Sequence, residues 1–293
     1  MEELKNCPVC DSNQSKSFLE CKDNTVSKAI FSIVECTSCS FKYTNPRPEE
    51  KDLGKYYMSE EYVSHSNTSK GFINFVYQKV RNYTLKGKLN LINRLHSNKG
   101  NLLDVGCGTG EFLNVCAINK WNTTGIEPSD SARNFGKEQY NLNVQTEDSL
   151  TTFKEQQFDV ITMWHVLEHV PHLNNRIQEL KKVLANDGVL LIAVPNCSSH
   201  DADYYKENWA AYDLPRHLYH FTPNTIEKLF TKHGFKLTEA IPMKFDSFYV
   251  SLLSEKYKGT SLQIIRGFWR GLVSNLKAGN NKYSSQIYIF RKD

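Results

Sequence analysis

The sequence lacks a long hydrophobic segment. Its longest purely apolar run, residues 189–194, is six residues long, whereas a membrane-spanning helix needs about 18 or more. The first residues, MEELKNCPVC, contain no apolar stretch behind a basic start, so we expect no secretory signal. Internal repeats and low-complexity tracts are also missing. We therefore expect a folded protein that works in the cytoplasm.

The sequence has little net charge for its length. Of its 293 residues, 36 are Lys or Arg and 32 are Asp or Glu, a formal charge of +4. The charge is uneven: residues 1–100 carry +4, residues 101–233 carry −6 and residues 234–293 carry +6. A nucleic-acid-binding protein more often has a concentrated basic stripe. The mild excess found here is equally compatible with a small-molecule enzyme.

Four of the eight cysteines form two C-x-x-C pairs near the amino terminus: Cys7, Cys10, Cys36 and Cys39. In a reducing compartment such pairs indicate metal binding rather than disulfides. Four thiolates complete a tetrahedral Zn²⁺ site with no open position, which makes it a structural site. Unligated thiols or a redox pair are the alternatives. We predict a zinc ribbon over residues 1–48, ending at the sequence Asn-Pro-Arg-Pro.

A connecting segment is expected over residues 49–99. Residues 56–70 are rich in Ser, Asn and Tyr, which is typical of a loop or a lid. From Phe72 to Leu95, apolar residues recur at helical spacing with Lys and Arg between them. We therefore predict a helical connector or lid.

Strand-like and helix-like segments alternate from residue 100 onward. The predicted strands cover residues 102–105, 123–126, 142–145, 158–163, 189–194, 235–240 and 286–291. The predicted helices cover residues 112–119, 131–140, 173–184, 223–232 and 262–276, the third of them ending at the turn residues 186–188. Strands that alternate with helices form a parallel sheet covered on both faces. Residues 100–293 are thus predicted to form an α/β domain with a doubly wound, mostly parallel sheet.

A glycine-rich turn, Leu-Leu-Asp-Val-Gly-Cys-Gly-Thr-Gly, follows the first of these strands. Glycine lets a ligand approach the backbone closely, because no Cβ stands in the way. The spacing differs from the G-x-G-x-x-G of pyrophosphate binders, and Asp104 at the strand end would disfavour a pyrophosphate. Glu127, 23 residues later, is placed to accept hydrogen bonds from both ribose hydroxyls. The set fits a ligand with an adenosine, no phosphates and a cationic amino-acid tail.

The motif D-V-G-C-G-T-G at 104–110, the acid at 127 and the segment F-D-V-I-T-M-W-H-V-L-E-H-V at 158–170 resemble the class I S-adenosylmethionine-dependent methyltransferases. The resemblance covers about residues 100–240 and implies a seven-stranded sheet with the cofactor above its first strands. The cofactor-binding candidates are Asp104, Gly106, Cys107, Gly108, Gly110, Glu127, Asp148, Ser149 and Trp164. A dinucleotide-binding turn or a purely structural turn is the alternative.

The segment His-Val-Leu-Glu-His at 165–169 matches a pattern of some zinc peptidases, but Pro171 follows almost at once and leaves no long helix to present the ligands. It also resembles the E-V-L-E-H segment of the ubiquinone-biosynthesis O-methyltransferases, in which acidic and His side chains hold a divalent cation. His165 stands where that family has Glu, which argues against Mg²⁺ because Mg²⁺ prefers oxygen ligands. We favour Glu168 and His169 as residues that orient the loop by hydrogen bonds, with a transition metal as the alternative.

Polar and aromatic residues are dense at 209–222, after the fifth predicted strand. Ligands of open α/β sheets lie beyond the carboxyl ends of the strands, so this segment is expected to face the methyl acceptor. Methyl transfer needs alignment and, for a hydroxyl acceptor, a base. The candidates are His165, His217 and His220, and each of them is alternatively a cap or a core residue.

We expect a methyltransferase that acts on a small-molecule or glycan acceptor, at oxygen more often than at carbon. A zinc-containing RNA methyltransferase and a non-catalytic cofactor-binding or scaffold protein are the alternatives. The mild charge argues against RNA, and the intact glycine motif argues against a scaffold. The amphipathic helix at 262–276 is expected to pack its apolar face on the domain, with Arg266, Arg270 and Lys277 on its other side. Contact with a membrane surface is the alternative.

Overall fold

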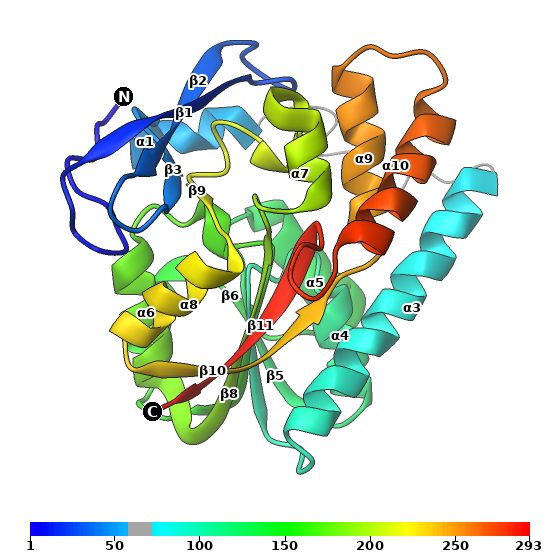
Figure 1. The fold of residues 1–293 in the computed structure, drawn as a ribbon. Coiled ribbons are helices and arrows are strands. Elements are labelled where there is room, and N and C mark those ends of the chain that lie inside the picture. The colour runs from blue at the N-terminus through cyan, green and yellow to red at the C-terminus, as the bar shows by residue number, and fades with distance from the viewer. Residues whose placement is uncertain (58–71) are drawn as a thin grey trace.

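The computed structural model describes residues 1–57 and 72–293. Apart from its first two residues, the loop or lid predicted at 56–70 lies outside the described residues. Figure 1 shows a large central sheet flanked by helices, with a smaller sheet formed near the amino terminus at one end of it.

The central sheet has seven strands in the order β10-β11-β8-β7-β4-β5-β6 (Figure 1). They are β4 (Asn101–Val105), β5 (Asn122–Ile126), β6 (Val144–Gln145), β7 (Phe158–Trp164), β8 (Leu184–Pro195), β10 (Phe235–Pro242) and β11 (Ser285–Lys292). The five strands β4 to β8 pair in parallel, whereas β11 runs antiparallel to both of its neighbours. The predicted α/β class with a doubly wound, mostly parallel, seven-stranded sheet is confirmed.

Helices cover both faces of this sheet. Successive residues of a strand point to opposite faces, so both faces present apolar side chains to the helices. Leu102 and Leu103, which are neighbours in β4, belong to two separate buried clusters. The cluster around Leu102 includes residues of α3 and α4, and the cluster around Leu103 includes residues of α6 and α8. The covering helices are α3 (Phe72–Leu95), α4 (Glu111–Ile118), α5 (Asp130–Tyr140), α6 (Leu173–Val183) and α8 (Pro223–Lys232).

Most predicted elements are found within a few residues of their expected bounds, but β8 begins earlier. α6 ends at Val183 and β8 starts at Leu184, so the turn predicted at 186–188 lies inside the strand. The pairing of β7 with β8 changes register between Phe158 and Val160, and the extra residues of β8 form a bulge there. The helices α7 (His200–Tyr205) and α9 (Asp246–Tyr257) have no counterpart in the prediction.

The amino-terminal segment forms an antiparallel sheet that includes a strand from much later in the chain. β1 (Ser15–Lys22), β2 (Ile30–Cys36) and β3 (Lys42–Thr44) are joined by β9 (Tyr219–His220). Arg47 donates hydrogen bonds to the hydroxyl of Tyr219 at 2.9 Å and to the carbonyl oxygen of Pro171 at 3.1 Å. The short helix α1 (Glu50–Leu53) follows. This segment is therefore continuous with the larger part of the protein through strand pairing and buried hydrogen bonds.

Between β10 and β11 the chain forms a helical hairpin of α9 and α10 (Gln263–Lys277), seen at the upper right of Figure 1. The buried face of α10 consists of Gly267, Gly271 and Ser274. A Cβ at either glycine would lie 2.7 Å from a backbone Cα of α9, so only small residues fit there. The expectation that the apolar face of this helix packs on the domain is wrong, because most of its large apolar side chains are exposed.

Candidate active site

The glycine turn between β4 and α4 adopts a backbone that favours glycine. The φ angles are +71° at Gly106, +55° at Gly108 and +86° at Gly110, all in the left-handed region that β-carbons disfavour. A Cβ on Gly106 would meet Val166 at 2.4 Å, but a Cβ on Gly108 would meet nothing within 4 Å. The backbone at Gly108 therefore borders open space, as a ligand-binding turn requires.

Glu127 lies beside this turn, directly after β5. Its carboxylate accepts a hydrogen bond from the backbone N–H of Gly108 at 2.9 Å and another from that of Ser129 at 2.9 Å. Each oxygen keeps lone-pair capacity, since a carboxylate accepts about four hydrogen bonds. The side chain is thus fixed next to Gly108 and still able to accept from two hydroxyl groups.

Asp104 is buried at the end of β4 and accepts a hydrogen bond of 2.6 Å from the hydroxyl of Thr162. Burial raises the pKa of the Asp104 carboxyl to about 7, although Thr162 and the positive charge of Lys88 oppose the rise. A nearby cation strongly stabilises the ionised form of such a buried carboxyl. That Asp104 lies close to a cationic ligand stays a prediction.

The other predicted cofactor residues follow the neighbouring strands. Asp148 and Ser149 lie after β6 in a 3₁₀ turn, η2 (Glu147–Thr152), and Trp164 ends β7. The Cys107 thiol is buried, and it occupies the space into which a side chain on Gly125 would project. Because β7, β4, β5 and β6 are adjacent and parallel, all of these residues lie at one edge of the sheet.

Lys88 of α3 is a member of this group that the sequence reasoning missed. Its Nζ lies 4.1 Å from the ring centroid of Trp164 and 5.8 Å from that of Phe112. Burial lowers the pKa of Lys88, although the carboxylates of Asp104 and Asp246 oppose the shift. A lone Lys on a helix gives no motif, so only the fold brings this cation to the edge of the sheet that carries Asp104 and Trp164.

His165 follows β7 in a left-handed conformation, with φ of +57°. Its Nε2 lies 2.9 Å from the carboxylate of Asp246, and its Nδ1 lies 3.5 Å from that of Glu168. Burial alone would lower the pKa of His165, but these two carboxylates raise it to about 10. The imidazole is therefore protonated at neutral pH, and it is suited to holding charge rather than to accepting a proton.

Glu168, His169 and His217 place three ligand atoms within 4.8 Å of one another. Nδ1 of His217 lies 2.9 Å from the carbonyl oxygen of Ala211, and Nδ1 of His169 lies 3.1 Å from that of Arg216. Since a carbonyl only accepts, Nδ1 of His217 carries a proton and its Nε2 keeps a free lone pair. Nδ1 of His169 also lies 2.9 Å from the hydroxyl of Tyr57, which can donate to it or accept from it. This cluster can accept a proton or hold a cation.

The carboxylate of Glu168 is fully buried, and neither of its oxygens has a hydrogen-bond partner among the described residues. The prediction that Glu168 orients the loop by hydrogen bonding is therefore wrong for its side chain, whereas His169 does bond to the neighbouring loop. A buried carboxylate needs a compensating positive charge, which protonated His165 supplies. One carboxylate and two imidazoles also fit a divalent transition ion better than Mg²⁺.

His220 lies in β9 and is buried. The Thr44 hydroxyl donates to the carbonyl oxygen of His217 at 2.7 Å and lies 3.2 Å from Nε2 of His220. Because the hydroxyl proton is already used, Nε2 of His220 is the donor in the second contact. Burial holds the pKa of His220 well below its ordinary value, so the ring is neutral and its Nε2 carries a proton.

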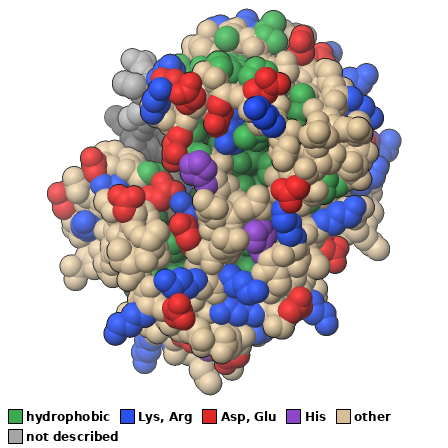
Figure 2. All heavy atoms as spheres, turned by 90° about the vertical axis from the view of Figure 1, so that its left-hand side faces the viewer, with side chains coloured by type: hydrophobic (Ala, Val, Ile, Leu, Met, Phe, Trp, Pro, Cys, Tyr) green, Lys and Arg blue, Asp and Glu red, His purple; other side chains and the backbone are tan. Residues whose placement is uncertain are grey.

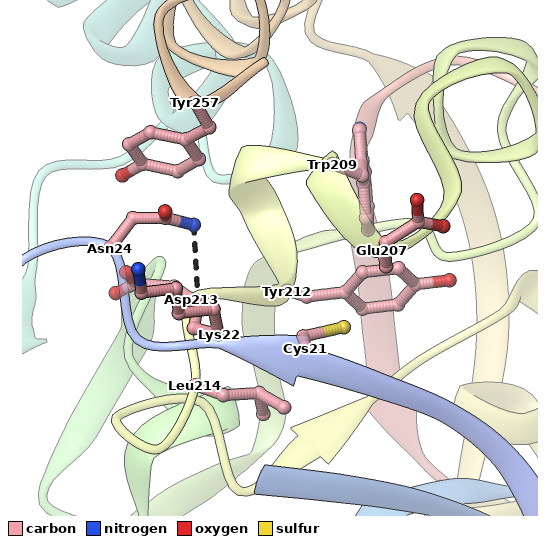
Figure 3. A pocket seen from close by; sticks show the side chains of 9 residues that line it. All are labelled: Cys21, Lys22, Asn24, Glu207, Trp209, Tyr212, Asp213, Leu214 and Tyr257. Carbon is pink, nitrogen blue, oxygen red and sulfur yellow. Dashed lines mark hydrogen bonds between the residues drawn. The ribbon is translucent and has the colours of Figure 1, made fainter. Parts of the chain in front are cut away.

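A small hollow lies beside the loop that carries His217 (Figure 3). Its lining comprises Cys21, Lys22, Asn24, Glu207, Trp209, Tyr212, Asp213, Leu214 and Tyr257. Oδ2 of Asp213 lies 3.9 Å from Nε2 of His217, and Asp213 also forms an ion pair with buried Arg216. The side chain of Asp213 therefore lies between the hollow and the cluster of Glu168, His169 and His217.

The two C-x-x-C pairs come together as predicted from their spacing. The Sγ atoms of Cys7 and Cys39 are 3.5 Å apart, as are those of Cys10 and Cys36, and all four lie within 4.8 Å. Tetrahedral zinc with bonds of about 2.3 Å needs sulfur atoms about 3.8 Å apart. The residue that follows each pair, Asp11 or Ser40, has a φ of +62°. Its N–H donates to the carbonyl oxygen of the first cysteine of that pair at 2.9 Å.

The sequence of this chain is similar to those of known proteins. Residues 77–240, more than half of the chain, match the family described as a methyltransferase domain. The ubiquinone biosynthesis O-methyltransferase of Coxiella burnetii (strain Dugway 5J108-111) is 33% identical over 119 residues, which are 39% of this chain and 46% of that protein. The protein of the same name from Actinobacillus pleuropneumoniae serotype 7 is 37% identical over 106 residues, 32% of this chain and 45% of that protein. The chain spans about half the length of these curated relatives.

Solved structures share the fold. The PH0226 protein of Pyrococcus horikoshii OT3 superposes with a TM-score of 0.52 at 15% identity, over 80% of this chain and 99% of that one. A SAM-dependent methyltransferase from Archaeoglobus fulgidus gives a TM-score of 0.50 at 20% identity, over 76% of this chain and 100% of that one. At these identities the likeness concerns the fold alone.

Proposed function

The chain belongs to the methyltransferase-domain family, and we propose that it transfers the methyl group of S-adenosylmethionine to an oxygen atom of a small-molecule acceptor. One observation carries the proposal: the open backbone at Gly108 lies beside the fixed carboxylate of Glu127. A nucleoside can approach the first closely, and its ribose hydroxyls find an acceptor in the second. The match to O-methyltransferases of ubiquinone biosynthesis supports oxygen as the methylated atom.

S-adenosylmethionine, when bound, supplies an electrophilic methyl group on a sulfonium. We assign Glu127 to the ribose and the residues after β6, Asp148 and Ser149, to the adenine. The methionine tail carries an ammonium and a carboxylate, for which the buried acid Asp104 and the cation Lys88 provide opposite charges. The glycine backbone at 106–110 and the ring of Trp164 complete the pocket.

Among the three predicted histidines, we assign the base to His217. Its Nε2 keeps a free lone pair because Nδ1 donates to Ala211, and it lies beside the Glu168 carboxylate. The His165 ring is cationic, and Nε2 of His220 is used as a donor to Thr44. In this proposal His217 accepts the proton of the acceptor hydroxyl as the oxygen attacks, while Glu168 and Asp213 stabilise the resulting imidazolium.

A divalent ion on Glu168, His169 and His217 is the second candidate for this cluster. The buried carboxylate without a hydrogen-bond partner and the two imidazoles beside it fit such an ion. Bound there, the ion would polarise an acceptor oxygen. If turnover survives the removal of every divalent ion except the cysteine-bound one, the role of His217 as a base is favoured. If turnover is lost and Mn²⁺ or Fe²⁺ restores it, an ion at this cluster is favoured.

For the cysteine cluster we infer one structural zinc ion, held by Cys7, Cys10, Cys36 and Cys39. The proposal rests on the sulfur separations and on the two matching turns at Asp11 and Ser40. Backbone N–H groups of Cys39 and Ser38 overcome burial and lower the pKa of Cys36 to about 7, which favours its thiolate. Burial raises the pKa of Cys7 and that of Cys39, so these two thiols need the metal itself to ionise. Residues 1–48 as the zinc-bearing unit, 49–99 as the connector and 100–293 as the catalytic unit remain our proposed division.

A small-molecule acceptor is favoured over RNA by the surface charge. On the face shown in Figure 2, Lys and Arg side chains are interspersed with Asp and Glu, without the continuous basic band that a nucleic-acid binder presents. We keep a glycan as the alternative acceptor, and we propose that the protein acts in the cytoplasm.

Calorimetry with S-adenosylhomocysteine tests the cofactor assignment. We expect binding by the wild-type protein and a loss of roughly 10- to 100-fold in affinity for Glu127→Ala, since hydrogen bonds to a charged group contribute about 1.5–3 kcal/mol. Glu138→Ala, at an exposed position of α5, is the matched control and should bind normally. Binding of NADH in place of S-adenosylhomocysteine would overturn the assignment. Labelled S-adenosylmethionine incubated with small-molecule, glycan and RNA pools then identifies the acceptor class.

A further inference from the structure

Helix α10 exposes a continuous group of large apolar side chains. Leu262, at its amino-terminal cap, is 67% exposed, and within the helix the exposed fractions are 66% for Ile264, 65% for Ile265, 59% for Phe268, 61% for Trp269 and 76% for Leu276. At 3.6 residues per turn, the five helical positions fall on one broad side. We call these six residues the α10 apolar face. An isolated exposed leucine needs no explanation, but a group of this size usually marks a contact surface.

The exposure follows from how the hairpin is packed. The side of α10 that meets α9 consists of Gly267, Gly271 and Ser274, and the helix backbones approach so closely that no larger residue fits. This close approach fixes the rotation of α10 about its own axis. Most of its large side chains then point away from α9, and they stay exposed among the described residues. The ring of Phe268 lies 5.2 Å from that of Phe248 in α9 and is still 59% exposed.

Positive charge predominates in the segment that carries the α10 apolar face. The segment from Met243 to Ser284 contains seven Lys and Arg residues but only two acids, Asp246 and Glu255. Neither acid offers an exposed negative charge, because Asp246 pairs with His165 and Glu255 is 2% exposed. On α10 itself, Arg266, Arg270 and Lys277 lie on the side next to the apolar face, and the helix carries no acid at all. The guanidinium of Arg270 stacks on the ring of Tyr204, 3.8 Å from its centroid.

We propose that the α10 apolar face binds to the surface of a membrane rich in anionic lipids, with the helix lying in the interface. Apolar and aromatic side chains on one side of a helix and cations on the adjacent side are the features of such helices. Anionic head groups attract nearby Lys and Arg residues. None of the described helices could span a bilayer.

A second copy of the chain fits the α10 apolar face less well than an anionic membrane surface does. In a two-fold dimer the same patch lies on both subunits, so the cations of the two α10 helices would meet at close range. No exposed acid in this segment is available to neutralise them. An anionic surface satisfies both the apolar and the positive parts of the patch.

Co-sedimentation of the full chain with phosphatidylglycerol vesicles tests the proposal. We expect binding to these vesicles, much weaker binding to phosphatidylcholine vesicles, and release as salt screens the charges. The double variant Ile265→Ser/Trp269→Ser should bind at least about tenfold more weakly, because it removes two large apolar side chains from the contact. Ile118→Ser, at a 72% exposed position of α4, is the matched control and should bind like the wild type.

Tryptophan fluorescence locates the contact. Of the four tryptophans, Trp121 and Trp209 are almost fully buried, whereas Trp269 is 61% exposed. We expect a blue shift on addition of phosphatidylglycerol vesicles, and we expect Trp269→Phe to abolish that shift while binding persists. These measurements need neither cofactor nor acceptor, so their result is independent of the proposed methyl transfer.

Two outcomes would overturn the inference. Equal binding of the wild type and the Ile265→Ser/Trp269→Ser variant would show that another surface contacts the lipid. An absence of vesicle binding, together with a wild-type dimer in sedimentation that the double variant lacks, would assign the face to a second copy of the chain.

Discussion

Nε2 of His165 lies 2.9 Å from Oδ2 of Asp246, the first residue of α9. This pair joins the end of β7, where the predicted cofactor and acceptor residues meet, to the helical hairpin that carries the α10 apolar face. The second nitrogen of His165 lies 3.5 Å from Glu168, so one imidazolium stands between two carboxylates. The charge state of the site therefore depends on the position of the hairpin.

The first prediction concerns Asp246→Asn. Because the pKa of His165 is raised from 6.5 to about 10, the ion pairs stabilise the folded chain below pH 6.5. This contribution is lost as the pH rises through about 10. We expect the pKa of His165, measured by NMR titration of the imidazole, to be lower in the variant. We also expect the free energy of unfolding of the variant to fall less than that of the wild type between these pH values. An unchanged His165 titration in Asp246→Asn would contradict the assignment.

The second prediction concerns pH and cofactor affinity through Asp104. Its pKa is raised from 3.8 to about 7 by burial, so the unfolded chain ionises first, and stability falls as the pH rises between these values. A cationic ligand favours the ionised carboxyl. We therefore expect S-adenosylmethionine to bind more tightly at pH 7.5 than at pH 5.5, with release of a proton that calorimetry in two buffers detects. Asp104→Asn should bind weakly at both pH values, and a wild-type affinity independent of pH would refute the role.

The third prediction separates His217 from its neighbours. His217→Gln removes the free Nε2 lone pair, so we expect the turnover number to fall by about 10²- to 10⁴-fold, the usual contribution of a general base. The affinity for S-adenosylhomocysteine should stay within about twofold, because His217 lies outside the proposed cofactor pocket. His172→Gln, whose side chain is 64% exposed, serves as the control. If His220→Gln lowered turnover and His217→Gln did not, the two roles would have to be exchanged.

The edge of the sheet that gathers the proposed cofactor residues was predictable, because these residues form local motifs. Asp104, the glycine turn and Glu127 are read from a strand, a turn and the next strand, and parallel pairing brings the strand ends together. Lys88 and Asp246 were not predictable, since each reaches the site across more than one element and neither belongs to a motif. The choice among His165, His217 and His220 depends on the partner of each ring nitrogen, which the sequence does not specify.

The hairpin shows the opposite case, in which a sequence pattern misleads. The amphipathic pattern of 262–276 predicts a buried apolar face, but Gly267, Gly271 and Ser274 make the contact because the backbones approach so closely. α9 gives no apolar stripe either, since Ser247, Ser251 and Ser254 are among its buried residues. Small residues specify this packing, and hydrophobic periodicity does not detect them.

The last prediction links the cysteine cluster to the active site. β3 begins three residues after Cys39 and pairs with β9 at Lys42 and Tyr43, and Thr44 then donates to the carbonyl oxygen of His217. Loss of the metal should therefore loosen the strand that holds the proposed base. We expect Cys39→Ser to lower Tm by roughly 10 °C, since a structural zinc ion contributes several kcal/mol. We also expect it to reduce turnover more than cofactor affinity.

Ser38→Ala changes a residue of the same turn that is not a ligand, and it should leave Tm and turnover close to those of the wild type. Chelation of the wild-type protein should reproduce the effect of Cys39→Ser, and added zinc should reverse it. If the purified chain held less than about half a zinc ion, or if Cys39→Ser resembled Ser38→Ala, the four thiols would not be a metal site. The pairing of β3 with β9 would then have to depend on the buried contacts of Thr44 and Arg47 alone.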